Sequence, residues 1–265
     1  MRSYLLLAMG WALQFSACKK PPEAPKELNQ LSTYLYQEWD NEDPAVMEAG
    51  LANLRAFLRD EDLEGGIMDR SWELEPISKS DVSDIPFPKD ADPKNTLGVA
   101  VSYLSSWPVA DHAVLQLEED QLPAEPSAKV YTRSFPDEGK PACFLDQSCD
   151  PLSSVNDIER QNLLLSVVMV LYKDFRWIET EQGLAVAARS WLEESFEGQN
   201  GSSNIVQSYS VDIWLPVGKK TWRYQTLWSE SEVAGASDAA TIGTLKSSID
   251  RAMETADEAI EELYH

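Results

Sequence analysis

Apolar residues recur every three or four positions in two segments near the start of the chain, which predicts two amphipathic helices within residues 27–66. Asp43 and Pro44 mark the start of the second helix, because aspartate caps free backbone amides and proline fits the first helical position. The apolar positions of the two helices are Leu28, Leu31, Leu35, Trp39, Leu51, Leu54, Phe57 and Leu58. Gly65 and Gly66 follow the second helix, so we end the helical segment there.

After residue 66 the spacing of apolar residues changes to alternation, which predicts β-strands. The predicted strands are residues 71–77, 98–104, 163–175, 183–190, 205–215 and 221–228. The last four are joined by turn-forming segments, among them residues 197–204 and 216–220, so we expect an antiparallel meander. Residues 78–95 are rich in Asp, Pro and Lys and are predicted to form a long loop.

The last apolar pattern has helical spacing over residues 239–263, with Ser237 or Asp238 as the N-terminal cap. Its apolar face contains Ile242, Leu245, Ile249, Met253, Ala256, Ile260 and Leu263. A helix that follows an antiparallel sheet buries its apolar stripe by packing across that sheet. We therefore predict an α+β fold for residues 67–265, in which a curved antiparallel meander is packed by the long C-terminal helix and preceded by the two N-terminal helices.

This order of elements resembles the helix-grip folds of the START type. In those proteins apolar ligands are held between the C-terminal helix and the sheet. The resemblance covers only the element order of roughly the last hundred residues, and without a START-type sequence motif it implies a fold and transfers no function.

Residues 1–17 have the features of a signal peptide: a positive start at Arg2 and an apolar run, residues 4–15, that is too short to span a bilayer. The run leads into Phe-Ser-Ala-Cys, which resembles the lipobox of bacterial lipoproteins, with Phe15 where leucine is usual. The resemblance implies that the chain is cut before Cys18 and that the cysteine thiol carries a diacylglycerol. An ordinary secretory signal with an incidental cysteine is the alternative.

The lipobox resemblance implies a lipid-anchored protein of the bacterial cell envelope. Lys19 stands where an aspartate favours retention in the inner membrane, so we expect the outer membrane. Residues 18–26 contain three prolines and are predicted to form an extended tether. Two or three acyl chains give durable attachment, since one chain alone anchors only marginally. The expected partners are the membrane, through the anchor at Cys18, and an envelope protein.

The chain is strongly acidic, with 45 acidic and 22 basic side chains and a formal net charge of −23. Such a field repels nucleic acid and anionic lipid head groups, so we exclude nucleic-acid binding, whereas metal cations and cationic partners remain compatible with it. With 43% hydrophobic residues and nine tryptophans, the chain differs from a disordered acidic polymer and can bury a sizeable core.

Cys143 and Cys149 remain as an even pair once Cys18 is acylated. In an exported protein we predict that they form a disulfide that closes a short loop. A redox-active pair more often has two residues between its cysteines. A metal site needs more ligands than His112 and His265 can add.

Aromatic residues on the predicted strands are the candidate ligand-binding residues. Trp222, Tyr224 and Trp228 share one face of the last strand. Arg189 and Trp191 share one face of an earlier strand. A row of aromatic residues on a sheet can line a carbohydrate or lipid pocket. The alternative is that these residues pack against a helix.

No catalytic motif is present. The sequence has no Gly-x-Ser-x-Gly, His-Glu-x-x-His, phosphate-binding or dinucleotide-binding motif, and we predict no cofactor. His112 is the one histidine apart from the last residue, and we interpret it as structural. Alternating acids before Gly65 are ordered as in an EF-hand loop, but Ser71 stands where the final carboxylate ligand is needed.

We therefore predict a non-catalytic interaction or structural lipoprotein of the cell envelope. The alternative is a binding module that holds an apolar or carbohydrate ligand between the sheet and the C-terminal helix. A cavity lined by the Trp222 face favours the binding module, and a filled core with an exposed apolar patch favours the interaction protein.

Overall fold

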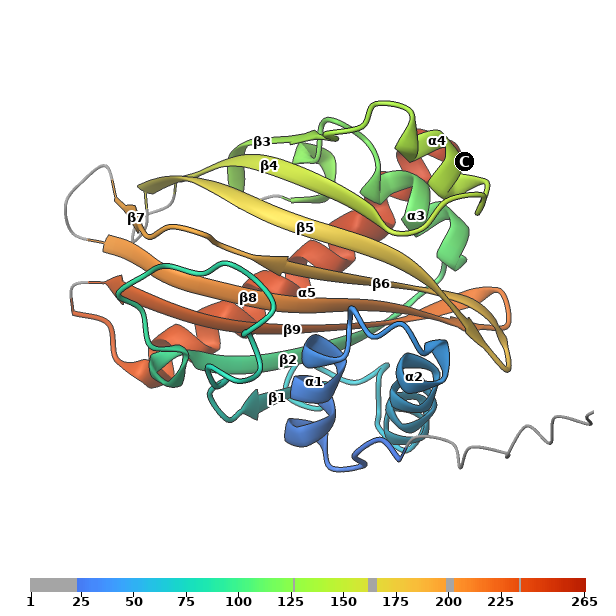
Figure 1. Ribbon diagram of the computed structural model, residues 1–265, viewed down its shortest axis with the longest axis horizontal. Coiled ribbons are helices and arrows are strands. Elements are labelled where there is room, and N and C mark those ends of the chain that lie inside the picture. Colours follow the sequence, from blue (N-terminus) through green and yellow to red (C-terminus); the bar gives the residue numbers. More distant parts are fainter. Residues whose placement is uncertain (1–22, 126, 162–165, 199–202, 234) are drawn as a thin grey trace, which may run out of the picture.

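The computed structural model describes residues 23–125, 127–161, 166–198, 203–233 and 235–265. The predicted signal peptide, Cys18 and most of the predicted tether lie outside the described residues, as do residues 163–165 of a predicted strand. The described chain forms an antiparallel sheet with helices on both faces (Figure 1).

Within the described residues the sheet has nine strands in the order β1-β2-β9-β8-β6-β5-β4-β3, and the short β7 pairs with β8. The strands are β1 Ser71–Leu74, β2 Leu97–Ser105, β3 Ala128–Ser134, β4 Leu152–Gln161, β5 Ser166–Thr180, β6 Gly183–Trp191, β7 Phe196–Glu197, β8 Ser203–Val217 and β9 Lys220–Val233. The predicted meander is confirmed, because β5, β6, β8 and β9 pair in this order and are antiparallel.

The helices are α1 Leu28–Gln37, α2 Pro44–Arg59, α3 Val109–Gln116, α4 Lys140–Leu145 and α5 Asp238–Tyr264, with short 3-10 helices η1 Pro93–Asn95 and η2 Leu122–Ala124. The two predicted N-terminal helices are confirmed as α1 and α2. None of the helices in the described part of the chain is both long and apolar enough to cross a bilayer.

The turn between β8 and β9 is the tight hairpin predicted at residues 216–220. Val217 pairs with Lys220, so Gly218 and Lys219 alone form the turn. Gly218 has a φ of +63°, in the left-handed region that glycine adopts without strain.

Between β2 and β5 the chain forms elements that the apolar pattern does not predict: α3, α4, β3 and β4. β3 lies at the edge of the sheet, and most of its side chains are at least partly exposed. β4 places polar Ser154 and Asn156 at buried positions. Neither strand therefore shows the apolar alternation by which a strand is recognised.

α1 and α2 cover one face of the sheet (Figure 1). The Asp43 side chain accepts a hydrogen bond from the Ala45 amide at 3.2 Å, which confirms the predicted cap of α2. Apolar residues of both helices form one core with residues of the sheet, including Trp191, Tyr209 and Trp228. The N-terminal helices thus share the core of the sheet.

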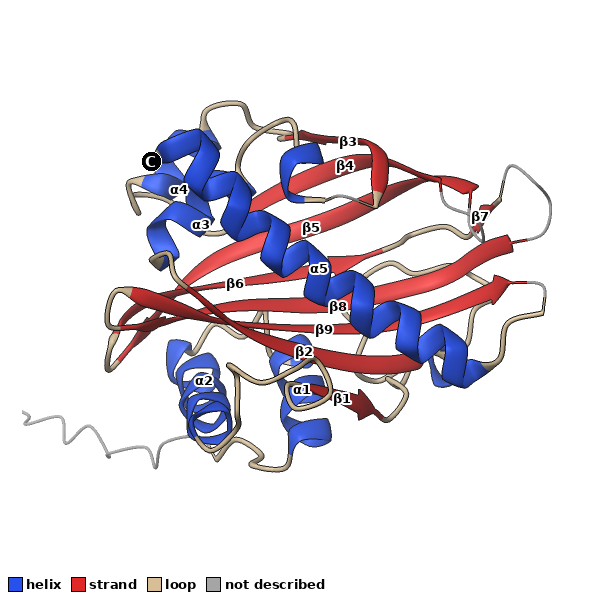
Figure 2. Ribbon diagram, turned by 180° about the vertical axis from the view of Figure 1, so that it is seen from behind, coloured by secondary structure: helices blue, strands red, loops and turns tan. Residues whose placement is uncertain are grey.

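α5 crosses the opposite face of the sheet, as Figure 2 shows. Ser237 Oγ accepts a hydrogen bond from the Ala240 amide at 3.3 Å, so Ser237 is the cap. Ile249 and Met253 pack on β2, and the last turns pack on α3 and η2. Leu263, which we placed on the apolar face, is 52% exposed. The predicted α+β fold is confirmed, and its curved sheet and C-terminal helix have the helix-grip arrangement.

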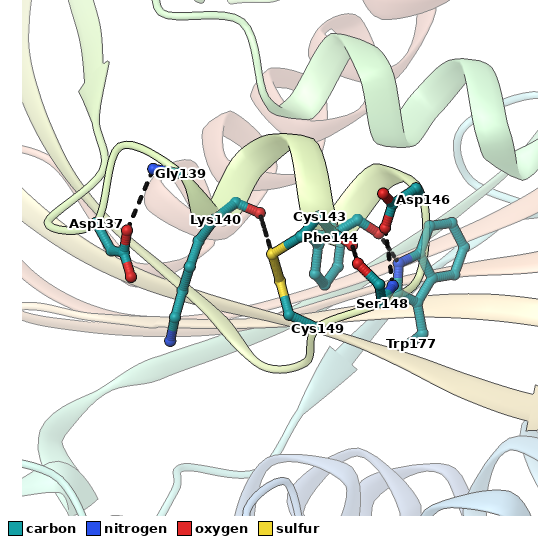
Figure 3. The surroundings of a disulfide bond; sticks show 9 residues. All are labelled: Asp137, Gly139, Lys140, Cys143, Phe144, Asp146, Ser148, Cys149 and Trp177. Carbon is teal, nitrogen blue, oxygen red and sulfur yellow. Dashed lines mark hydrogen bonds between the residues drawn. A yellow bond between two sulfur atoms is a disulfide. The ribbon is translucent and has the colours of Figure 1, made fainter.

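The predicted disulfide is present between Cys143 in α4 and Cys149 in the turn that follows (Figure 3). The Trp177 indole N–H in β5 donates to the Phe144 carbonyl at 2.8 Å, and the two rings stack with centroids 5.5 Å apart. The disulfide therefore closes a short loop next to the contact between α4 and β5.

Replacing Cys143 or Cys149 by Ser is expected to lower the free energy of unfolding by about 2 kcal/mol, because the open chain regains the entropy of a short loop. Urea unfolding of each variant, compared with the wild-type protein with and without reductant, measures the change. Both variants are expected to match the reduced wild-type protein. A wild-type protein whose unfolding ignores reductant would contradict this role of the bond.

Candidate functional site

A cavity of about 710 Å³ lies between α5 and the sheet. Residues of β5, β6, β8 and β9 form its floor, α5 forms its roof, and β3, β4 and η2 form one side. Ala240 and Thr244, on the first turns of α5, line the cavity and are exposed. The cavity therefore opens to solvent beside these turns.

Part of the floor carries hydroxyl groups. Ser190, Ser208, Ser210 and Ser229 line the cavity from three strands, and Ser248 faces it from α5. Ser190 Oγ and Ser210 Oγ lie 2.7 Å apart and share a hydrogen bond. Hydroxyls both donate and accept hydrogen bonds, so this part of the wall suits a polar group or water.

One end of the cavity has an apolar wall. Ile158, Met169, Leu192 and Ile205 line it and pack on one another as one buried cluster. Apolar surface of a ligand gains about 25 cal/mol for each Å² that such a wall removes from water. This end can therefore hold a hydrocarbon group.

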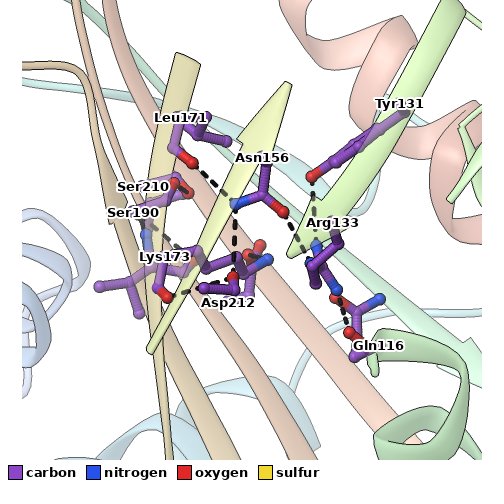
Figure 4. A network of polar contacts seen from close by, with 12 residues as sticks. Gln116, Tyr131, Arg133, Asn156, Leu171, Lys173, Ser190, Ser210 and Asp212 are labelled. Atoms are coloured by element: carbon purple, nitrogen blue, oxygen red, sulfur yellow. Dashed lines mark hydrogen bonds and ion pairs between the residues drawn. The ribbon is translucent and has the colours of Figure 1, made fainter. Parts of the chain in front are cut away.

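The cavity becomes charged farther along β5 and β8 (Figure 4). Lys173 Nζ lies 2.5 Å from Asp212 Oδ2, and each of the two side chains is 9% exposed. Arg133 donates to Asn156 Oδ1 at 2.7 Å and to the Tyr131 hydroxyl at 3.2 Å. It also donates to a backbone carbonyl at the end of α3. Cations from β3 and β5 are thus held at this end.

Arg223 extends the charged end to β9. Its Nη1 donates to the Met253 carbonyl of α5 at 3.1 Å. Burial lowers the pKa of both Arg223 and Arg133, because removal from water disfavours a charged group. Both side chains still carry their charge, since a guanidinium stays protonated in proteins.

The five candidate residues from the sequence lie on the opposite face of the sheet, beneath α1 and α2, and none of them lines the cavity. They are Arg189, Trp191, Trp222, Tyr224 and Trp228. The Tyr224 hydroxyl lies 2.6 Å from Ser32 Oγ of α1. The Trp228 indole donates to the Glu75 carbonyl at 3.0 Å. Tyr224 and Trp228 are core residues, which is the alternative that the sequence left open.

Alternation along β9 separates the two faces as predicted, but the cavity lies on the other one. Arg223, Gln225 and Leu227 line it, and they alternate with the aromatic residues. Because helices cover both faces, alternation alone does not tell which face meets α5. A usable signal is Ser208, Ser210 and Asp212 in β8, whose polar face lies under a predicted helix instead of in solvent.

His112 belongs to a buried polar cluster that joins α3, β2 and α5. Ser105 Oγ donates to Asp257 Oδ1 at 2.7 Å and lies 2.8 Å from His112 Nε2. Ser105 and His112 are 0% and 1% exposed, so a substrate has no access to them. The cluster holds α5 against the sheet, in agreement with our interpretation of His112 as structural.

Stability is expected to fall as the pH drops below about 6.5, because burial holds the pKa of His112 well below its usual value. The unfolded chain then binds a proton that the folded protein does not, which costs up to about 1.4 kcal/mol per pH unit. Burial raises the pKa of Asp257, so the folded protein binds this proton more readily than the unfolded chain, and this contribution raises the stability as the pH falls further. Urea unfolding between pH 7 and 5 measures the slope.

The variant His112→Gln tests the source of that slope. It keeps a side chain that can hydrogen-bond to Ser105 but does not titrate. The variant is expected to be less stable at neutral pH and to lose less stability on acidification than the wild-type protein. Parallel slopes for the two proteins would assign the pH dependence to other groups.

Within the described ranges, no three His, Cys, Asp or Glu side chains are grouped as a metal site.

Neither protein-family models nor curated protein sequences match the chain. Among solved structures, a STAR-related lipid transfer protein from Xanthomonas axonopodis is similar with a TM-score of 0.46 and 8% identity, over 63% of this chain and 87% of that one. A START superfamily protein from Mycobacterium smegmatis has a TM-score of 0.41 and 9% identity, over 63% and 98% of the two chains. The Zhui aromatase/cyclase of a Streptomyces species has a TM-score of 0.39 and 9% identity, over 62% and 91%. Scores and identities this low carry no argument about ligand or activity.

Proposed function

We propose that this protein is a lipid-anchored binding protein that holds a small amphipathic molecule between α5 and the sheet. The observation that carries the proposal is the cavity of about 710 Å³. Small-molecule sites in proteins usually occupy about 300–1,000 Å³. The combination of an apolar wall with serine hydroxyls and buried cations supports a ligand that has both an apolar and a polar part.

The cavity favours binding over a purely structural role. Protein interiors are packed closely, and a void under a helix destabilises the fold in proportion to its volume. A protein that served only as a scaffold would gain stability by filling this space with larger side chains. The small serine side chains on the floor leave the space open instead. The sequence alternative, a binding module between sheet and helix, is therefore the function that we prefer.

The address in the cell envelope rests on the lipobox-like segment that ends at Cys18. The described chain begins at Glu23, and α1 begins at Leu28, so few residues separate the proposed anchor from the folded part. The net charge of −23 repels anionic head groups. A short tether keeps the folded part close to the membrane, and its negative charge keeps it off the anionic head groups. This arrangement suits a carrier or sensor that works beside the outer membrane.

Native mass spectrometry of the mature protein, with detergent removed in the gas phase, tests the binding function. We expect a mass excess that survives detergent removal, disappears on denaturation and is identified as an amphipathic small molecule. Ala252→Trp, which places a large ring in the cavity from α5, is expected to abolish the excess. Ala239→Trp is the matched control, since Ala239 is exposed and lies outside the lining. A bare mass for the wild-type protein, before and after incubation with a fatty acid, would contradict the proposal.

Cys18→Ser is expected to abolish the incorporation of labelled palmitate, because the serine hydroxyl cannot form the thioether that carries the lipid. Cells that express the chain in the presence of the label, followed by gel autoradiography, measure the change. Cys143→Ser is the matched control, and it should incorporate label like the wild-type protein. Label that persists in Cys18→Ser would exclude the lipoprotein assignment.

A further inference from the structure

Two buried arginines in the cavity form no ion pair with a carboxylate among the described residues. Arg133 and Arg223 line the cavity and are 1% and 7% exposed. Among the residues that the structure describes, no carboxylate oxygen lies within 4 Å of either guanidinium. By contrast, buried Arg189 contacts Asp40 at 2.6 Å. Arg133 and Arg223 therefore differ from an arginine that serves packing.

The hydrogen-bond partners of these two guanidiniums are neutral. Arg133 donates to Asn156, to Tyr131 and to a carbonyl of α3, and Arg223 donates to a carbonyl of α5. Asp257 and Asp212 act on the charge of Arg223 from farther away, but Asp257 accepts hydrogen bonds from Ser105 and Ser106, and Asp212 is paired with Lys173. A buried charge without a counter-charge is costly, so this arrangement favours binding of an anion.

A third donor is present at the same end of the cavity. Trp214 lines the cavity, is 2% exposed, and its indole N–H has no hydrogen-bond partner among the described residues. The ring lies 5.9 Å from the Arg223 guanidinium and 5.7 Å from Lys173 Nζ. An unpaired buried N–H costs about 1–3 kcal/mol unless a ligand accepts its hydrogen bond.

The lining of the cavity as a whole carries a net positive charge. Arg133, Arg160, Lys173 and Arg223 face two carboxylates, Glu125 and Asp212. The lining is thus cationic in a chain whose net charge is −23. A surplus of cations and donors in a buried site selects for a ligand that is anionic and rich in acceptors.

Apolar and cationic residues are separated along the strands. On β5, Met169 belongs to the apolar wall and Lys173 to the charged end, about 13 Å apart at the usual rise of a strand. On β8, Ile205 likewise belongs to the apolar wall and Trp214 to the charged end. A ligand that satisfies both ends must have an apolar part and an anionic group several bonds away.

We propose that the cavity binds an anionic amphiphile whose carboxylate or phosphate group contacts Arg133, Arg223 and the Trp214 N–H, while its hydrocarbon part lies against the wall of Ile158, Met169, Leu192 and Ile205. This inference rests on the proposed binding function and names the class of ligand for the same cavity.

The experiment compares palmitic acid, methyl palmitate and hexadecyl phosphate as probes for the full mature protein. These three probes share a chain length and differ in the head group. Native mass spectrometry of the protein with each probe at equal concentration measures the bound fraction. We expect the acid or the phosphate to be retained at least tenfold more than the neutral ester. The order of acid and phosphate identifies the head group.

Variants locate the binding of the anionic group. Arg133→Gln and Arg223→Gln, which keep a donor but remove the charge, are expected to reduce the preference over the ester to less than threefold. Lys129→Gln is the matched control, because Lys129 is exposed and lies outside the lining. If the arginine variants fail to fold, the comparison of acid and ester on the wild-type protein decides alone.

The two proposals fail in different ways. Equal retention of acid, phosphate and ester, all lost in Ala252→Trp, would overturn the anionic head group and leave the binding function intact. Retention of none of the probes, with no endogenous ligand, would overturn both. A preference for the acid or the phosphate that persists in both arginine variants would also overturn the site assigned here.

Discussion

Replacing Arg189 by Ala is expected to lower the free energy of unfolding by about 1.5–3 kcal/mol, the usual range for hydrogen bonds to a charged group, because its close partners Asp40 and Asp84 keep contact with water. Arg189 is 2% exposed. It lies 2.6 Å from Asp40 and 2.5 Å from Asp84, and Asp174 is 3.9 Å away. The guanidinium thus joins the end of the α1 segment and the long loop to β6. Removing it leaves the largely buried Asp174 and the exposed Asp40 and Asp84 without their counter-charge.

Urea unfolding followed by tryptophan fluorescence measures this loss. Arg59→Ala is the matched control, because Arg59 is mostly exposed beside Asp60 and an exposed pair contributes about 0–1 kcal/mol. Arg189→Ala is expected to leave the ligand in the cavity, since Arg189 lies on the other face of the sheet. If the variant lost the proposed ligand but kept its stability, the result would contradict the structural role of Arg189 and support the binding role predicted from the sequence.

Trp228→Ala is expected to cost about 3–5 kcal/mol, the usual range for truncating a fully buried tryptophan. Trp228 is 0% exposed, and its ring meets Tyr36 of α1 edge to face at 6.1 Å between centroids. A Cβ atom added at Gly98 would lie 2.8 Å from the Trp228 ring, so the ring is closely enclosed. The truncation leaves a cavity that these neighbours cannot fill completely.

The same unfolding assay measures this variant, with Trp228→Phe as its control. The phenyl ring keeps part of the packing but loses the hydrogen bond to Glu75, so its loss is expected to be smaller. Ligand retention in the mass-spectrometric assay is expected to be unchanged in both variants. A Trp228→Ala variant as stable as the wild-type protein would contradict the role of this residue in the core.

The sequence predicts those elements whose apolar pattern is strong. α1, α2 and α5 have a clear apolar stripe and a capping residue, and the strands of the meander alternate between turn residues. The disulfide follows from the one pair of cysteines that remains after Cys18 is assigned to the predicted lipid anchor of a chain predicted to be exported. These features depend on neighbours in sequence, so local physics is enough to find them.

The cavity and its charged end depend on contacts between distant segments. Arg133 lies on β3 and Arg223 on β9, far apart in sequence, and nothing local shows that they line one cavity. β4 is missed because its buried Asn156 bonds to Arg133 instead of packing on apolar neighbours. Buried polar residues interrupt the apolar alternation by which a strand is predicted from sequence. The charged end of the cavity is thus the part that is hardest to predict from the sequence.

The pairing of β2 with β9 has a consequence for how the chain folds. Leu97 lies opposite Ser229, so about half of the chain separates strands that are neighbours in the sheet. Contacts between such distant segments require the closure of large loops and slow the folding transition. α1, the first helix, packs on β8 and β9, so its contacts with the sheet can form only after these strands have been synthesised. A chain that emerges from its amino terminus therefore cannot complete its core before β9 has appeared, and the first helices have only each other until then.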